Sequence, residues 1–128
     1  MEYTNKKERS FKRFLKSFKF AFQGLKYAFT YEQNMVVHIL ITILVIVAGI
    51  RLDISTLEWL FCFIVIGLVI ATELINTSIE AVVDLVTEEK KALAKIAKDT
   101  ASAAVFVFAL IACFIGVVIF VPKIIALF

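Results

Sequence analysis

The sequence is poor in the residues that form loops and water-exposed surfaces. Its 128 residues include one proline and four glycines, too few for a collagen-like or low-complexity chain. Charged residues make up 20% of the chain and hydrophobic residues 62%, against about 45–50% in a soluble domain. The two cysteines, Cys62 and Cys113, lie inside apolar runs, which excludes a disulfide scaffold. The composition therefore excludes an ordinary soluble enzyme and a disordered tail. It predicts a small integral membrane protein with a single domain over residues 1–128.

Known nucleotide-binding signatures are also missing. The four glycines are far apart, so the chain has no Gly-x-x-x-x-Gly-Lys-Ser/Thr phosphate loop, and no protein-kinase signature is found. A nucleotide site in this chain would need a different construction.

Three apolar runs are present, at about 35–50, 57–71 and 101–121. A helix needs about 20 apolar residues to cross the hydrocarbon core of a bilayer. The third run is long enough alone, and each of the first two must borrow residues at its cytoplasmic end. We therefore predict an all-α membrane protein that crosses the bilayer at about 31–50, 57–86 (including a cytoplasmic extension) and 98–121.

The positions of the basic residues predict the orientation of these crossings. Of the 14 Lys and Arg residues, twelve lie in residues 1–34 and 86–100. Because cytoplasmic loops carry the excess of Lys and Arg, we expect both segments in the cytoplasm. The turn at 51–56 and the C-terminus then lie outside.

The segment at about 10–29 has a pattern of its own. Large apolar residues recur at steps of three and four, which predicts one face of a helix, and most of the basic residues lie off that face. A basic amphipathic helix of this kind lies in the headgroup plane of a membrane. Two interpretations stay open: a membrane anchor alone, or an anchor whose Arg13 and neighbours also meet a phosphate-bearing ligand. The apolar positions are Phe11, Phe14, Leu15, Phe18, Phe22, Leu25 and Phe29.

A polar stripe follows the second apolar run. Glu73, Asn76, Glu80 and Asp84 are spaced by three, four and four residues, so on a helix they share an arc of about 80°. Glu73 lies nearest the hydrocarbon, and ionisable residues within membrane helices are functional candidates because burying them is costly. The alternative is that a helix leaving the bilayer simply carries a solvated acidic face.

The spacing of the acids limits their roles. Glu73 and Glu80 lie about 10 Å apart along a helix, so they cannot easily hold one metal ion together. Mg²⁺ usually takes one or two carboxylates plus phosphates, so Glu80 needs a second carboxylate from another helix. Glu32, at the cytoplasmic entrance of the first crossing, lies at a matching depth. Glu73, deeper and partly dehydrated, suits a general base.

A third polar cluster lies at the entrance of the last crossing. Lys98 supplies a point charge for a phosphate. Asp99 and Ser102 are candidate ligand contacts, although an acid and a hydroxyl are also favoured as caps at a helix start. Acids for a metal, a lysine for phosphate and a base at lipid depth together suggest phosphoryl transfer at the membrane surface.

The run Glu73-Leu-Ile-Asn-Thr-Ser-Ile-Glu-Ala-Val-Val-Asp84 resembles the signature of the prokaryotic diacylglycerol kinase and undecaprenol kinase family of small membrane lipid kinases. The likeness covers nearly the whole chain, including Phe22-Gln-Gly-Leu-Lys26, Glu32 and Ala94-Lys-Ile-Ala-Lys-Asp99. It implies a homotrimeric bundle in the bacterial cell membrane, in which each subunit has three crossings and a surface helix. It further implies active sites shared between neighbouring subunits, ATP as the phosphate donor, Mg²⁺ as the metal and a membrane lipid alcohol as the acceptor.

The resemblance also implies roles for individual residues. Glu73 is similar to the catalytic base that takes the proton of the lipid hydroxyl, and Glu32 and Glu80 are similar to the metal ligands beside ATP. The lipid headgroup would be contacted by Arg13, Glu73 and Ser102. The implied nucleotide contacts are Arg13, Glu32, Asn76, Glu80, Glu89, Lys90, Lys91, Lys98 and Asp99.

Two stretches of the sequence indicate which lipid alcohol accepts the phosphate. The start of the chain, Phe18 to Ala28, and the stretch 85–88 look more like the Gram-positive undecaprenol kinases, with diacylglycerol as the alternative substrate. Among functions other than catalysis, a small packing subunit and an ion-conducting subunit stay open as alternatives.

Relatives carry an arginine in an Asn-x-Arg-x-His pattern where this chain has Val36. His38 of the same pattern is expected to be a helix-packing or interfacial residue.

Overall fold

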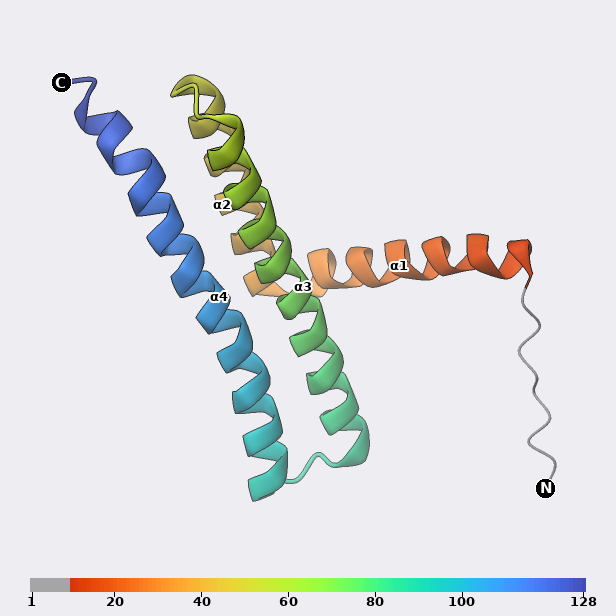
Figure 1. Cartoon of the computed structure of the whole chain (residues 1–128). Coiled ribbons are helices and arrows are strands. Elements are labelled where there is room, and N and C mark those ends of the chain that lie inside the picture. Colours follow the sequence, from red (N-terminus) through yellow and green to blue (C-terminus); the bar gives the residue numbers. More distant parts are fainter. Residues whose placement is uncertain (1–9) are drawn as a thin grey trace, which may run out of the picture.

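The computed structural model describes residues 10–128, so Lys6, Lys7 and Arg9, which contribute to the charge argument, lie outside the described residues. The described chain is entirely helical, with no strand, which confirms the all-α prediction. Figure 1 shows four helices in chain order: α1 Phe11–Tyr31, α2 Gln33–Arg51, α3 Thr56–Val86 and α4 Ala92–Ile125.

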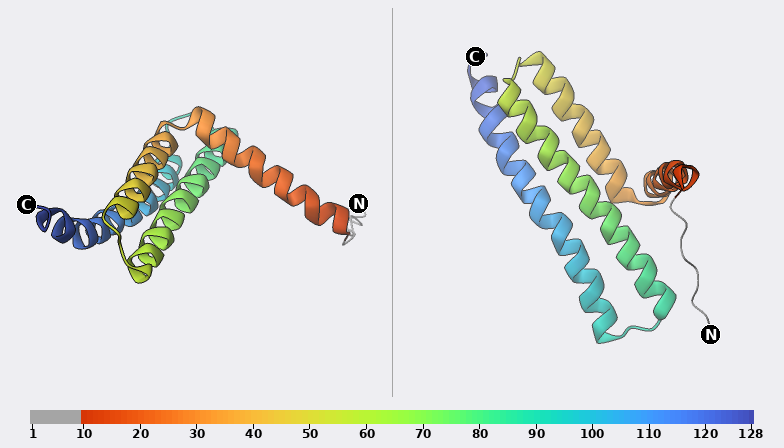
Figure 2. Two further views of the ribbon diagram at one scale, coloured as in Figure 1. Left: turned by 90° about the horizontal axis from the view of Figure 1, so that it is seen from above. Right: turned by 45° about the vertical axis from the view of Figure 1, so that its right-hand side comes forward.

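Helices α2, α3 and α4 are long and apolar enough to cross a membrane. The 19 residues of α2 rise about 28 Å, close to the roughly 30 Å thickness of a bilayer core. The 31 residues of α3 and the 34 of α4 rise about 46 and 51 Å, so both helices extend well past such a core. Figure 2 shows that this extra length forms a two-helix extension beyond the start of α2.

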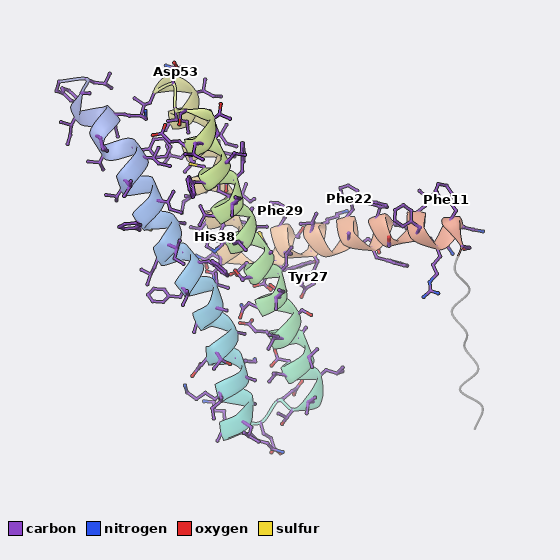
Figure 3. The ribbon with its side chains drawn as sticks, viewed as in Figure 1. Phe11, Phe22, Tyr27, Phe29, His38 and Asp53 are labelled. Atoms are coloured by element: carbon purple, nitrogen blue, oxygen red, sulfur yellow. The ribbon has the colours of Figure 1, made fainter. Side chains whose placement is uncertain are left out.

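Helix α1 leaves the bundle sideways at Glu32 (Figures 1 and 2). The backbone of Glu32 is extended (φ −99°, ψ 111°), and its N–H donates to the carbonyl oxygen of Ala28 at 2.9 Å, which ends α1. At the other end, the Ser10 side chain caps α1 by accepting from the N–H of Arg13. The aromatic side chains of α1, among them Phe11 and Phe22, are exposed along the helix (Figure 3).

The turn between α2 and α3 is short and well capped. Asp53 adopts a left-handed backbone conformation (φ 49°), which Asp tolerates better than most residues. The N–H of Glu58 donates to Ser55 Oγ at 3.2 Å, and the N–H of Ser55 donates to Glu58 Oε2 at 2.7 Å, forming a capping box. The C-terminus of the chain lies at this same end of the bundle (Figure 1).

Little apolar surface is buried within the described chain. A small core of Ile54, Cys62 and Ile119 lies near the α2–α3 turn, where Trp59 packs closely against Gly49. Most other large apolar side chains of α2, α3 and α4 are exposed. Such a surface fits contact with lipid or with other subunits better than contact with water.

The start of α4 differs from the expectation. The helix begins at Ala92, with Lys91 as its N-cap, rather than at residue 98, and the connection from α3 is only residues 87–91. The residues at 92–97 are Ala-Leu-Ala-Lys-Ile-Ala, which favour helix and contain no breaker, so α4 continues beside the end of α3.

Candidate active site

Glu73 lies in the interior of the bundle. Its side chain is 1% exposed, and Asn76, one turn later, is also buried. The alternative of a solvated acidic face is therefore wrong for this part of the stripe. Glu73 is 17 residues from the start of α3, about 26 Å along the axis, a distance slightly shorter than the roughly 30 Å thickness of a bilayer core.

A cavity of about 250 Å³ lies beside Glu73, and three helices line it. Polar groups reach it from every side: Asn34 and His38 from α2, Asn76 from α3 and Ser102 from α4. Its apolar lining consists of Val37, Val105, Phe106 and Ala109. A cavity of this size can hold the hydroxyl end of a lipid, whereas a long acyl or prenyl chain has to lie outside it.

Asn76 joins the cavity to Glu80 through hydrogen bonds. The hydroxyl of Ser102 donates to Asn76 Oδ1 at 3.4 Å, and Asn76 Nδ2 donates to Glu80 Oε1 at 3.2 Å. Ser102 and Asp99 lie inside α4 and not at its start, so the capping interpretation of these two residues is wrong. Ser102 instead connects α4 to the polar stripe of α3.

His38 is a residue of this site that the sequence did not reveal. Its Nε2 lies 3.7 Å from Glu73 Oε2, and its side chain is 17% exposed. Figure 3 shows His38 at the level where α1 meets the bundle. The expectation of a packing or interfacial role is therefore incomplete. The available signal was the four-residue spacing of Asn34 and His38, which places both on one face of α2. Val36, the residue of this chain at the arginine position of the Asn-x-Arg-x-His pattern, is 43% exposed, whereas His38 faces the site.

A second cavity, of about 690 Å³, lies at the end of the two-helix extension. Lys98 Nζ donates to Asp84 Oδ1 at 2.5 Å there, and Lys95 forms an ion pair with Asp99. Asp84 is 11 residues beyond Glu73, so the two sites lie about 16 Å apart along α3. The predicted nucleotide contacts that line this cavity are Glu89, Lys90, Lys91, Lys98 and Asp99.

Two predicted site residues come from the α1 side. Glu32 forms the junction of α1 and α2, and the charges of Glu32 and Glu80 both act on Glu73. Arg13 is 19 residues before Glu32, about 28 Å along α1, so one chain does not bring it to Glu73.

Two carboxylates near Glu73 could serve as ligands of a hard divalent cation. The described residues contain no group of three or more His, Cys, Asp or Glu side chains that could enclose a metal ion. Glu32 and Glu80 are two carboxylates from different elements, a number typical of Mg²⁺ sites that phosphates and water complete.

Residues 19–120 match the protein family described as "Prokaryotic diacylglycerol kinase". The chain is 43% identical over 111 residues to the undecaprenol kinase of Bacillus subtilis, which covers 87% of this chain and 90% of that protein. It is 36% identical over 114 residues to the diacylglycerol kinase of Synechocystis sp., covering 88% and 65% of the two chains. It is 38% identical over 98 residues to the diacylglycerol kinase of Helicobacter pylori, covering 77% of each.

Proposed function

Because the chain belongs to the prokaryotic diacylglycerol kinase family and is a lipid kinase, we propose that it transfers the γ-phosphate of ATP to the hydroxyl of undecaprenol. The match to the Bacillus subtilis undecaprenol kinase supports this acceptor, since it has higher identity and covers more of the relative than the matches to the Synechocystis and Helicobacter pylori diacylglycerol kinases. Diacylglycerol is the alternative acceptor.

One observation carries the chemistry: Glu73 is a carboxylate in the bundle interior with 1% exposure, and no close hydrogen bond from residues 10–128 reaches either of its oxygens, although Asn34 and His38 lie beside it in the cavity. A buried carboxylate is costly unless something pairs with it. The lipid hydroxyl is that partner. Glu73 accepts its proton while the lipid oxygen forms a bond to the γ-phosphorus. The bond to the β,γ-bridging oxygen breaks, and ADP leaves with that electron pair. Protonated Glu73 then returns its proton to water.

The remaining residues hold the phosphate donor in place. Lys98 and the segment 89–91 contact the phosphates and the nucleotide from the larger cavity, with Asp99 beside them. Asn76 orients groups near the γ-phosphate through its bond to Glu80. Glu32 and Glu80 would hold Mg²⁺, which when bound offsets the charge of the phosphates.

A homotrimer completes each site. The exposed apolar faces of the three long helices are available for contact with other subunits as well as with lipid. Gly116 of the Ala112-x-x-x-Gly116 pattern has no described neighbour within 4 Å of where a Cβ would lie. Arg13, remote from Glu73 in its own chain, reaches the site of a neighbouring subunit. Helix α1 lies on the cytoplasmic membrane surface, with its Phe side chains in the headgroup region.

The orientation of the chain in the bacterial cell membrane follows from its charges. The N-terminus and the 86–100 segment are cytoplasmic, where ATP is available, and the C-terminus is outside. Glu73 then lies at the inner boundary of the bilayer.

The proposal is tested with the purified protein in detergent and MgATP, by offering undecaprenol and diacylglycerol separately and measuring the phosphorylated lipid. We expect a higher kcat/KM for undecaprenol. Phosphorylation of diacylglycerol alone would overturn the proposed acceptor, and the absence of phosphorylated lipid with both acceptors would overturn the lipid kinase activity of this chain.

A further inference from the structure

Glu73 has an ionisable neighbour on another helix that the chemistry above does not use. His38 Nε2 on α2 lies 3.7 Å from Glu73 Oε2 on α3, and both residues line the 250 Å³ cavity. The ionisable groups whose charges act on Glu73 include two acids, Glu32 and Glu80, and one base, His38. The other charged neighbours of Glu73 are therefore acidic, and His38 is the ionisable group that can offset a negative charge. Asn34, which lines the same cavity, is an uncharged hydrogen-bond donor.

We propose that His38 is a positioning residue for Glu73, an inference that rests on the proposed role of Glu73 as base. The ring N–H at Nε2 holds Oε2, so that the other carboxylate oxygen is directed at the lipid hydroxyl. The neutral ring protonated at Nε2 and the imidazolium both supply this donor, so the role does not depend on the charge of the ring.

The separation of the two groups fits this role. At 3.7 Å the pair is too long for a direct hydrogen bond, which needs about 2.7–3.2 Å between N and O. Catalytic hydrogen bonds in unliganded enzymes are often long and shorten when the substrate binds. The required approach is less than about 1 Å, within the range of side-chain movement. The local backbone is held by Thr42, whose hydroxyl donates to the carbonyl oxygen of His38 at 2.8 Å.

The test separates positioning from packing by comparing two substitutions of one residue. His38→Leu removes the donor, whereas His38→Gln keeps an N–H donor at a similar reach. We expect His38→Leu to lower kcat at least about tenfold with KM for MgATP unchanged, and His38→Gln to restore kcat to within about threefold of wild type. Leu40→Ala is the matched control, because Leu40 lies two residues after His38 on α2, is exposed, and lines neither of the two cavities described above.

A double variant gives a second readout that a packing role would not change. If His38 acts through Glu73, then adding His38→Leu to Glu73→Gln causes no further loss of the residual rate. A further tenfold loss in that background would overturn the proposal, as would a wild-type kcat for His38→Leu. If His38→Leu does not fold, His38→Gln is compared with His38→Asn instead. Equal losses of kcat in these two variants would overturn the proposal, and activity in His38→Gln alone would support it. Failure of the proposed role of Glu73 is distinguishable, because it would appear as normal turnover in Glu73→Gln alone. Failure of the proposed function would appear as the absence of phosphorylated lipid in the wild-type protein.

Discussion

The hydrogen bonds through Asn76 predict a specific, non-additive pattern of stability. Ser102→Ala removes the bond that joins α4 to α3, and interhelical hydrogen bonds of this kind average about 0.6 kcal/mol in membrane proteins. Asn76→Leu removes that bond and also the Asn76–Glu80 pair at i,i+4, which adds about 0.2–0.5 kcal/mol. We therefore expect Asn76→Leu to lower the free energy of unfolding by about 1 kcal/mol.

The double variant tests whether the two residues act together. Because Asn76→Leu already leaves Ser102 without this partner, adding Ser102→Ala should cost nothing more. Unfolding in detergent can be followed by the fluorescence of Trp59, the single tryptophan of the chain. Thr100→Ala is the matched control, because within residues 10–128 the Thr100 hydroxyl donates only to carbonyl oxygens of its own helix, at 2.8 and 3.1 Å. Additive losses in the double variant would refute the connection from α4 to α3 through Asn76.

The same variants separate stability from catalysis. We expect Asn76→Leu to lower kcat about 100-fold, the scale of a displaced reacting group, although its effect on unfolding is small. Turnover near wild type would show that Asn76 does not orient the phosphate donor.

Two further predictions concern other parts of the chain. A Cβ at Gly49 would lie 2.6 and 2.8 Å from ring atoms of Trp59, so Gly49→Ala should destabilise the protein by about 1–3 kcal/mol. At Gly24 a Cβ would meet no described atom within 4 Å, so Gly24→Ala should be neutral or stabilising. The melting temperatures of the two variants test this difference. Lys98→Met should raise KM for MgATP about tenfold, since Lys98 lines the larger cavity. Lys123→Met, at the far end of α4, is the control and should leave KM unchanged. Equal KM values in the two variants would remove Lys98 from the nucleotide site.

Much of the fold could be predicted because it follows from local patterns. Three apolar runs, the first two extended at their cytoplasmic ends, predict the three long helices. The spacing of Glu73, Asn76 and Glu80 predicts that these side chains share one face. The direction of that face could not be predicted, because an 80° arc on one helix fits water as well as a bundle interior. To predict that the face carrying Glu73 points inward, the positions of α2 and α4, which enclose Glu73, have to be known.

The misses have related causes. Asp99 and Ser102 looked like caps because the start of α4 was placed too late. The spacing of Asn34 and His38 places both on one face of α2 but does not identify Glu73 as the partner of His38, since that contact joins residues 35 positions apart on different helices.

The most direct test of the account is phosphate transfer by Glu73→Gln, an amide of nearly the same shape that cannot accept the proton. Radiolabelled ATP and undecaprenol in lipid nanodiscs report the product, and nucleotide binding is measured on the same samples. The control is Asp53→Asn, which makes the same acid-to-amide change in the turn at the far end of the bundle. We predict at least a 100-fold loss of turnover in Glu73→Gln, because loss of a general base usually lowers the rate about 10²–10⁴-fold. Nucleotide binding should stay intact in Glu73→Gln, and turnover should be normal in Asp53→Asn. Near-normal turnover in Glu73→Gln would contradict the account.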